Sequence, residues 1–207
     1  MTSRPDWDAR YRDSDLPWDT GLPDPHLIEF VRGHHLVSGT ALEVGCGTGT
    51  NCLWLAEQGL EVLGIDIAPT AIEEAESKAA GVAHVRFACL DFLTQEVPDA
   101  PFDLVFDRGC FHVFDDDGDR ALFAERVARV VAPDGVWVSI IGSTEGPPRD
   151  HGPPRRTARE VVEAIEPVLE LVDLRGTEFR TDVPSPARAW FCVARRRKDP
   201  AQPSTRW

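Results

Sequence analysis

The clearest chemical signal in the sequence is a glycine loop, LEVGCGTGT, at residues 42–50. Gly45, Gly47 and Gly49 alternate with other residues here, directly after a short β-rich run and directly before a helical pattern. Because glycine has no Cβ atom, such a loop turns tightly and lets a ligand approach its backbone closely. We therefore expect this loop to bind a nucleotide-like ligand.

Acidic residues close the next two β-rich runs. Asp66 lies about twenty residues beyond the loop, where a carboxylate can accept hydrogen bonds from ribose hydroxyls. Asp91 is followed by Phe92, so a carboxylate that could receive an adenine amino group has an apolar wall beside it. In the dinucleotide-binding fingerprint the third glycine lies about three residues after the second, whereas Gly49 follows Gly47 more closely. The spacing argues against a nicotinamide cofactor and leaves other adenosine cofactors open.

Short β-rich runs alternate with helical patterns from residue 39 onward. The β-rich runs are 41–44, 61–66, 84–91, 102–107 and 136–142, and the helical patterns include 51–58, 69–80 and 122–131. Parallel strands need crossover connections, and helices supply them, so this order predicts a parallel sheet covered on both faces. Two further β-rich runs, 168–174 and 187–195, have no helical pattern between them and predict an antiparallel pair at one sheet edge.

Composition limits the kinds of ligand and compartment. A chain of 207 residues with 42% hydrophobic residues can bury one substantial core. A formal net charge of -13 repels phosphate backbones, so we expect no nucleic-acid substrate. No apolar run approaches the roughly 20 residues that span a bilayer, and the polar first residues do not resemble a secretory signal. We expect a cytoplasmic protein that has no membrane partner and acts on a small molecule.

The cysteines do not suggest a disulfide framework or a metal site. Their number is odd, most lie inside apolar runs, and no pair has zinc-ligand spacing: Cys46, Cys52, Cys89, Cys110 and Cys192. We expect buried thiols and no metal. The acidic run DDDGD, 115–119, is expected to be a solvated helix start and not a cation site.

Three of these motifs together resemble the class I S-adenosylmethionine-dependent methyltransferases: EVGCGTG, GIDIA and CLDF at successive strand ends. The resemblance implies an α/β, doubly wound, Rossmann-like fold, a seven-stranded mostly parallel sheet with an antiparallel C-terminal strand pair. It also implies S-adenosylmethionine as cofactor and S-adenosylhomocysteine as product. By this resemblance the three loop glycines line the amino-acid end of the cofactor, Asp66 and Ile67 the ribose, and Asp91 and Phe92 the adenine.

The N-terminal stretch WDARYRDSDLPWDTG, 7–21, is similar to the start of the thiopurine, thiol and halide methyltransferase group. Trp7, Tyr11 and Trp18 occupy its aromatic positions, with Tyr11 where a second tryptophan is common. An aromatic face can stabilise a sulfonium cation by roughly 0.5–2 kcal/mol, so these residues are candidate cofactor contacts in a closing flap, with Trp18 also near the substrate. The alternative is that the aromatic rings only fasten the N-terminus to the domain.

The run FDLVFDRGCFHVF, 102–114, leaves the fourth predicted strand at the edge of the sheet where ligands bind. In the family it resembles, this loop borders the transferring methyl. Asp107 is therefore a candidate catalytic and cofactor-binding residue, and Arg108, Phe111 and His112 are candidate substrate contacts. His112 has a side chain that titrates near neutrality and could act as a general base or orient a thiol. It could equally cap a helix or pack beside Phe111.

A proline-rich segment, EGPPRDHGPPRR at 145–156, leaves the fifth predicted strand at the same edge. Arg149 and His151 are candidate substrate contacts there, with a solvated loop as the alternative. We expect an N-terminal flap and helix at 1–38, a cofactor-binding methyltransferase domain at 39–197 and a flexible tail at 198–207, all in one structural domain.

Methyl transfer to a small soft nucleophile, a thiol above all, is the function these motifs favour. A thiol with a pKa of about 8.5 is partly ionised near neutrality, so the reaction does not require a strong base. Oxygen, nitrogen, halide, selenite and tellurite acceptors stay open, as does a non-catalytic sensor of the cofactor. The expected assembly is a monomer or a weak homodimer.

Overall fold

A seven-stranded sheet forms the centre of the protein in a computed structural model that describes residues 5–147, 152–179 and 186–197. Its strand order is β3-β2-β1-β4-β5-β7-β6. The strands are β1 (Thr40–Val44), β2 (Glu61–Asp66), β3 (Val85–Cys89), β4 (Phe102–Arg108), β5 (Val131–Gly142), β6 (Glu170–Glu178) and β7 (Arg188–Arg195). The first five pair in parallel, and β7 lies antiparallel to both β5 and β6, which confirms the predicted fold class.

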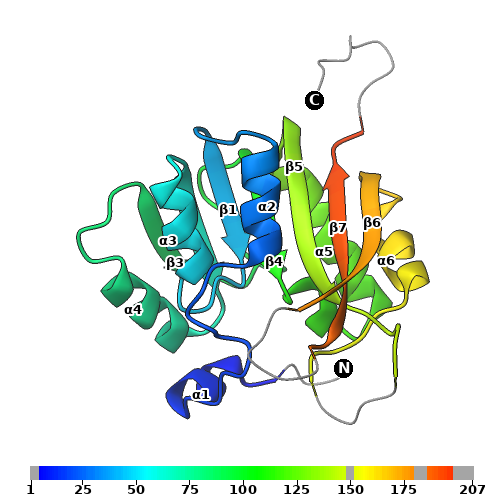
Figure 1. Ribbon diagram of the computed structural model, residues 1–207, viewed down its shortest axis with the longest axis horizontal. Helices are drawn as coiled ribbons and strands as arrows, with labels where there is room; N and C mark the ends of the chain where they lie inside the picture. Colours follow the sequence, from blue (N-terminus) through cyan, green and yellow to red (C-terminus); the bar gives the residue numbers. More distant parts are fainter. Residues whose placement is uncertain (1–4, 148–151, 180–185, 198–207) are drawn as a thin grey trace.

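Helices cover both faces of this sheet (Figure 1). They are α2 (Pro25–Gly33), α3 (Thr50–Glu57), α4 (Pro69–Lys78), α5 (Asp117–Val130) and α6 (Ala158–Ile165). Another helix, α1 (Trp7–Arg12), packs against the start of α4, and a short 3-10 turn, η1 (Phe111–Val113), follows β4. Pro25 and Pro69 each stand in the first turn of a helix, where the missing N–H costs no hydrogen bond. One core packs α2, α3 and α4 against the sheet, and a second packs α5 and α6 against the opposite face.

The fifth strand begins earlier than the pattern predicted. The sequence pattern predicts Val131 as the last residue of a helix. In the structure Val131 is the first residue of β5, because it pairs with Phe102 at the start of β4. The register shifts between Phe102 and Leu104, and the PDG turn of residues 133–135 lies in that irregularity. A tertiary pairing therefore overrides the local helical preference of Val131.

The strand order indicates where on the sheet a ligand binds. β1 and β4 are neighbours, but the chain reaches β4 only after adding β2 and β3 on the other side, so the connections diverge between them. Ligands bind outside the carboxyl ends of strands at such a switch point. Figure 1 shows β1 and β4 pointing toward the lower edge of the view, where α1 lies, and β7 pointing away from it.

Within the described ranges, no helix is both long and apolar enough to cross a membrane. The same residues contain no group of three or more His, Cys, Asp or Glu side chains that could hold a metal ion. All five cysteines are free thiols.

Candidate active site

A cavity of about 1280 Å³ opens at the carboxyl edge of the sheet. The glycine loop, the ends of β2, β3 and β4, and the N-terminal residues all contribute to its lining. Most of the predicted site residues share it: Trp7, Tyr11, Trp18, Gly45, Gly47, Asp66, Ile67, Asp91, Phe92, Arg108 and His112. Gly49, Asp107 and Phe111 are not part of the lining, and Arg149 and His151 lie outside the described residues.

Two of the loop glycines serve different purposes. Gly47 has a φ of +53°, and a Cβ atom there would lie 2.9 Å from the hydroxyl oxygen of Tyr11. Gly49 has a φ of +80° and begins α3, but a Cβ atom on it would lie 2.8 Å from the ring of Phe87. Gly47 therefore keeps the loop backbone open toward the cavity, whereas Gly49 lets α3 pack against the strand behind it.

Asp66 fastens the glycine loop to the end of β2. One carboxylate oxygen accepts the N–H of Gly47 at 2.9 Å and the other accepts the N–H of Ala68 at 3.0 Å. Burial raises the pKa of this carboxyl group above its usual value. Each carboxylate oxygen has a second acceptor position, so Asp66 can also receive ribose hydroxyls from the cavity.

Asp91 and Phe92, which follow β3, lie next to each other in the cavity lining. The carboxylate of Asp91 accepts the N–H of Leu93 at 3.0 Å and lines the cavity. Phe92 is 5% exposed and packs edge-on against Phe123, with ring centres 4.9 Å apart. Phe92 is thus a core residue that also presents part of its ring to the cavity.

These residues fit S-adenosylmethionine on structural grounds. A nucleoside requires close backbone approach, which the side-chain-free Gly47 allows, and hydrogen-bond acceptors for its hydroxyls and amino group, which Asp66 and Asp91 provide. An aromatic face can stabilise a sulfonium cation, and the lining contains Trp7 and Trp18. The volume exceeds the roughly 300–1,000 Å³ typical of a single small-molecule site, so a second molecule fits beside the cofactor.

The N-terminal aromatic residues form a small cluster over the glycine loop. Trp18 packs edge-on against Trp7 at 5.9 Å and against Tyr11 at 6.2 Å between ring centres. The guanidinium of Arg10 lies 4.4 Å from the Trp18 ring centre, so the ring already holds one cation. Tyr11 is buried, which raises the pKa of its hydroxyl, and the hydroxyl stays a neutral hydrogen-bonding group.

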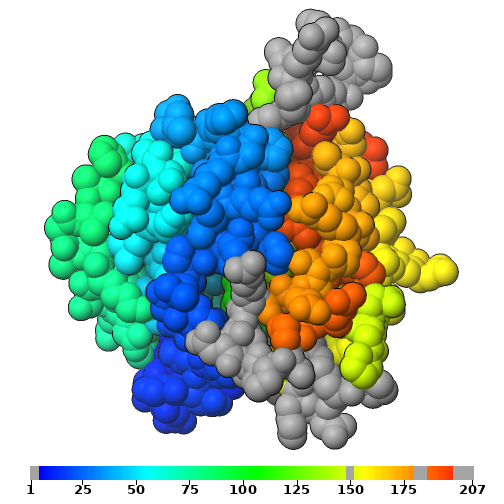
Figure 2. All heavy atoms as spheres, viewed as in Figure 1, coloured from blue at the N-terminus to red at the C-terminus, as the bar shows by residue number. Residues whose placement is uncertain are grey.

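Carboxylates tie this segment to the domain. Asp8 accepts the N–H of Thr70 at 2.9 Å, in the first turn of α4, which has no side-chain cap of its own. That hydrogen bond lowers the pKa of Asp8. Asp19 accepts the hydroxyl of Thr48 in the glycine loop at 2.7 Å. In Figure 2 the dark blue N-terminal residues lie at the lower left of the molecule, below the cyan and green residues, and the lighter blue residues that follow them lie between the cyan and orange parts. The segment is therefore both fastened to the domain and part of the cavity wall.

A chain of polar contacts connects the first strand to Trp18. Glu43 on β1 accepts the side-chain N–H of Asn51 at 2.7 Å, and the Asn51 carbonyl accepts the N–H of Asp24 at 2.8 Å. The Asp24 carboxylate then accepts the Nε–H of Arg108 at 2.8 Å. Arg108 in turn donates to the backbone carbonyl of Trp18 at 3.1 Å. Arg108, predicted as a substrate contact, thus holds the aromatic segment in place while it lines the cavity.

Sequence reasoning missed Glu43, Asp24 and Asn51. An acid inside an apolar strand, at the position of Glu43, was a visible signal, because an unpaired buried carboxylate is costly. Asp24 stands directly before Pro25 and reads as a helix cap, a role it also fills by accepting the N–H of His26. Nothing local indicated that it would pair with Arg108.

Asp107 is sealed beneath the loop that follows β4. It is fully buried, and its carboxylate accepts the backbone N–H groups of Cys110 and Phe111 and the indole N–H of Trp137 at 2.9–3.1 Å. Burial raises the pKa of Asp107. The structure gives it no access to the cavity, which places it as a positioning residue for the loop and not as a group that touches the reacting atoms. Phe111 is likewise fully buried, packed against Phe123 and Trp137.

His112 lines the cavity in a defined orientation. Its Nδ1 accepts the backbone N–H of Gly142 at 2.7 Å, and its ring packs edge-on against Phe179. Because a backbone N–H can only donate, Nδ1 carries no proton, and in a neutral ring the proton is on Nε2. A neutral imidazole in this tautomer donates from Nε2 and has no free lone pair there. The geometry therefore suits hydrogen bonding to an acceptor molecule better than proton abstraction.

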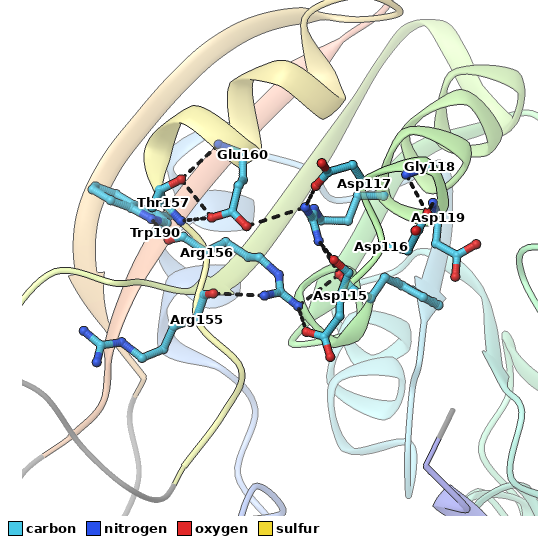
Figure 3. A network of polar contacts seen from close by, with 12 residues as sticks. Asp115, Asp116, Asp117, Gly118, Asp119, Arg155, Arg156, Thr157, Glu160 and Trp190 are labelled. Carbon is cyan, nitrogen blue, oxygen red and sulfur yellow. Dashed lines mark hydrogen bonds and ion pairs between the residues drawn. The ribbon is translucent and has the colours of Figure 1, made fainter. Parts of the chain in front are cut away.

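The acidic run 115–119 is tied to α6 by buried arginines (Figure 3). Asp116 caps α5 by accepting the N–H of Gly118 at 2.8 Å. Arg156 pairs with Asp115 at 2.6 Å, and Arg120 contacts Asp117 and reaches Glu160 at 3.5 Å. The run is thus the exposed start of α5, as predicted, and the ion pairs of Asp115 and Asp117 are an addition to that prediction.

Glu43 predicts a pH-dependent stability. Burial raises its pKa from 4.5 to about 7. Between these values the folded protein keeps a proton that the unfolded chain has lost, so the free energy of unfolding falls as the pH rises through this window. We expect Glu43→Gln to remove this loss, so that its free energy of unfolding exceeds that of the native protein by an amount that grows to about 3 kcal/mol between pH 4.5 and 7.5, measured by urea unfolding.

Glu57→Gln, on the exposed end of α3, is the control for Glu43→Gln and should show no such trend. A constant difference across the range would contradict the prediction.

Comparisons with known proteins agree with this geometry. A family model described as "Methyltransferase domain" matches residues 41–135. The chain is 33% identical over 151 residues to "Probable thiol methyltransferase 2" of Arabidopsis thaliana, covering 72% of this chain and 65% of that protein. It is 29% identical over 178 residues to "Thiocyanate methyltransferase 1" of Brassica oleracea, covering 84% and 75%. The chain therefore spans slightly less than two thirds of the length of the Arabidopsis relative.

A solved structure described as "Conversion of a Disulfide Bond into a Thioacetal Group during Echinomycin Biosynthesis" has the same fold. It superposes with a TM-score of 0.79 at 27% identity, covering 92% of this chain and 90% of that chain. The match extends over the antiparallel C-terminal strands, which the family model does not reach.

Proposed function

The chain belongs to the class I S-adenosylmethionine-dependent methyltransferases, and from this we propose that it transfers a methyl group to a small soft nucleophile, a thiol above all. The observation that carries the proposal is the single cavity in which the glycine loop, the aromatic segment and the loop after β4 meet. The Arabidopsis relative, named a probable thiol methyltransferase, supports sulfur as the accepting atom.

When bound, the cofactor supplies a methyl group whose carbon forms a bond to the acceptor lone pair as its bond to the sulfonium breaks, the electron pair remaining on the cofactor sulfur. The glycine loop and Asp66 hold one end of this molecule, and Asp91 with Phe92 the other. Trp7, Tyr11 and Trp18 cover the sulfonium region and exclude water. Since the largest contribution of such an enzyme is alignment of nucleophile and methyl, no strong base is required.

His112 is the residue that we assign to the acceptor. In its neutral form it donates from Nε2, so it orients an acceptor sulfur and leaves the thiol proton to pass to water or buffer. Asp107 contributes indirectly, because it fixes the backbone of the loop that carries Arg108 and His112. The aromatic segment, which is built into the cavity wall, favours an enzyme over a sensor, since a sensor has no need to enclose a methyl group.

The test is turnover on a panel of acceptors. The protein is incubated with S-adenosylmethionine and simple thiols, with iodide, selenite, tellurite, a phenol and an amine in parallel, and S-adenosylhomocysteine release is measured. We expect the highest kcat/KM with thiols. Higher turnover on the phenol or amine would move the assignment to oxygen or nitrogen, and cofactor binding without turnover on any acceptor would favour a sensor. A sedimentation measurement on the same samples tests the proposed monomer or weak homodimer.

A further inference from the structure

The acceptor side of the cavity lies between the loops that follow β4, β5 and β6 and the start of β7. Its walls are largely apolar, formed by Phe114, Pro147, Pro153, Pro154, Phe179 and Ala187. An inorganic anion such as iodide or thiocyanate would leave most of this wall uncovered. An organic acceptor with a ring-sized apolar body would bury it, and burial of apolar surface is the main source of affinity in such sites.

Among the described residues, the two arginines that line this side, Arg108 and Arg188, are already engaged. Arg108 pairs with Asp24 at 2.8 Å, and the Asp24 side chain is 1% exposed. Arg188 pairs with Glu178 at 2.9 Å. Breaking the first pair to bind an anion would leave a buried carboxylate without its partner, which is strongly unfavourable. Arg108 is therefore not arranged to receive a negatively charged acceptor, and the charge of the half-exposed Arg188 is offset by Glu178.

Three further carboxylates give the rim of this side a negative charge: Asp116, Asp119 and Glu145. Among the described residues, no lysine or arginine lies within ion-pair distance of them, whereas their neighbour Asp115 pairs with Arg156. The segments 148–151 and 180–185, outside the described residues, each contain one arginine and one aspartate and add no net formal charge. An acceptor carrying negative charge would approach this rim against repulsion.

We propose that the cavity selects an apolar organic thiol that bears no negative charge apart from its reacting sulfur, and that it discriminates against anionic acceptors. The inference rests on the proposed function and narrows its substrate class. The reaction balances without a further reagent: the thiol proton leaves to water or buffer, the sulfur lone pair forms the bond to the methyl carbon, and the departing pair stays on the cofactor sulfur. The product is a neutral or cationic thioether.

Three benzenethiols of nearly equal size test this proposal: para-(aminomethyl)benzenethiol, para-(hydroxymethyl)benzenethiol and para-mercaptobenzoate. Calorimetry on the protein saturated with S-adenosylhomocysteine measures their binding without turnover. We expect the carboxylate compound to bind at least tenfold more weakly than the hydroxymethyl compound, and the aminomethyl compound to bind at least as tightly as the hydroxymethyl compound. Equal or tighter binding of the carboxylate would overturn the proposal.

Charge-removing variants locate the origin of the discrimination. Asp119→Asn with Glu145→Gln should reduce the difference between the carboxylate and hydroxymethyl compounds to about threefold. The control, Glu57→Gln with Glu125→Gln, makes the same change in net charge at exposed positions outside the cavity and should retain the full difference. Melting temperatures verify that both double variants fold. An unchanged preference in the rim variant, or an equal loss in the control, would contradict the assignment to the rim.

Turnover of the same compounds separates this inference from the proposed function. After kcat/KM is divided by the ionised fraction of each thiol, we expect its order to follow the order of binding. Iodide and thiocyanate should have lower kcat/KM values than the hydroxymethyl compound. A binding preference without methylation of any thiol would retain the selectivity and reject thiol methylation. Methylation of thiols without a charge preference would support thiol methylation and reject the selectivity.

Discussion

Gly47→Ala is expected to weaken S-adenosylmethionine binding about a hundredfold, or about 2.7 kcal/mol, as measured by calorimetry. Two effects combine at this position. A φ of +53° is unfavourable for any residue with a side chain, and the new methyl carbon would lie 2.9 Å from the Tyr11 hydroxyl oxygen. Relief of that contact moves either the loop, whose N–H is held by Asp66, or the aromatic segment, and both line the cavity.

Gly81→Ala is the matched control for Gly47→Ala. Gly81 has a φ of +84°, but no atom lies within 4 Å of the Cβ position. Both variants should lose about 1 kcal/mol or more of stability from backbone strain, while only Gly47→Ala loses cofactor affinity. Adding Tyr11→Phe to Gly47→Ala removes the hydroxyl from the close contact and should recover part of the affinity. Native affinity in Gly47→Ala would show that the loop does not approach the cofactor.

Trp18→Ala should lower kcat/KM for the cofactor about tenfold and the melting temperature only slightly. The loss corresponds to an aromatic contact with a sulfonium, worth roughly 0.5–2 kcal/mol. Stability should change little because the segment keeps its other attachments: Arg108 binds the backbone carbonyl of residue 18, and Asp19 still bonds to Thr48. Steady-state kinetics and thermal unfolding without cofactor provide the two measurements.

Trp54→Ala and Trp18→Phe are the comparisons for this variant. Trp54, on α3, packs against a core and is not part of the cavity lining, so its truncation should reduce the melting temperature and leave the cofactor KM unchanged. Trp18→Phe retains an aromatic face and should recover most of the activity. If Trp18→Ala unfolded the protein as readily as Trp54→Ala and had native cofactor kinetics, its role would be to fasten the N-terminus.

The parallel sheet with its antiparallel C-terminal pair and the cofactor motifs were predictable because each depends on local requirements. Alternating β-rich and helical runs require a parallel sheet, and the expected strand pairing at the C-terminus follows from the missing helix between the last two runs. A glycine loop with acids at the next strand ends predicts a nucleoside site, since backbone approach and carboxylate acceptors are properties of residue type and position. Gly47 and Asp66 both line the cavity, and a direct hydrogen bond that the sequence did not predict joins them.

The roles inside the loop after β4 were not predictable in the same way. Asp107 and His112 have the residue types of catalytic groups, but the side-chain partner of Asp107 is Trp137 on β5, thirty positions later in the chain. The Asp107 carboxylate accepts hydrogen bonds from that indole and from two backbone N–H groups, so it holds the loop in place. His112 receives the N–H of Gly142, also on β5, and this bond decides its tautomer.

Residue types and their spacing thus indicated the fold class, the cofactor class and many of the side chains around the cavity, because those features arise within one element or between consecutive elements. The tertiary structure decided which of these side chains line the cavity. Gly49 turns toward Phe87, Asp107 is sealed in the core, and Arg108 pairs with Asp24, far away in the sequence. Each of these outcomes satisfies a packing or hydrogen-bonding requirement of a distant residue, and a buried polar group must find such a partner wherever the fold supplies it.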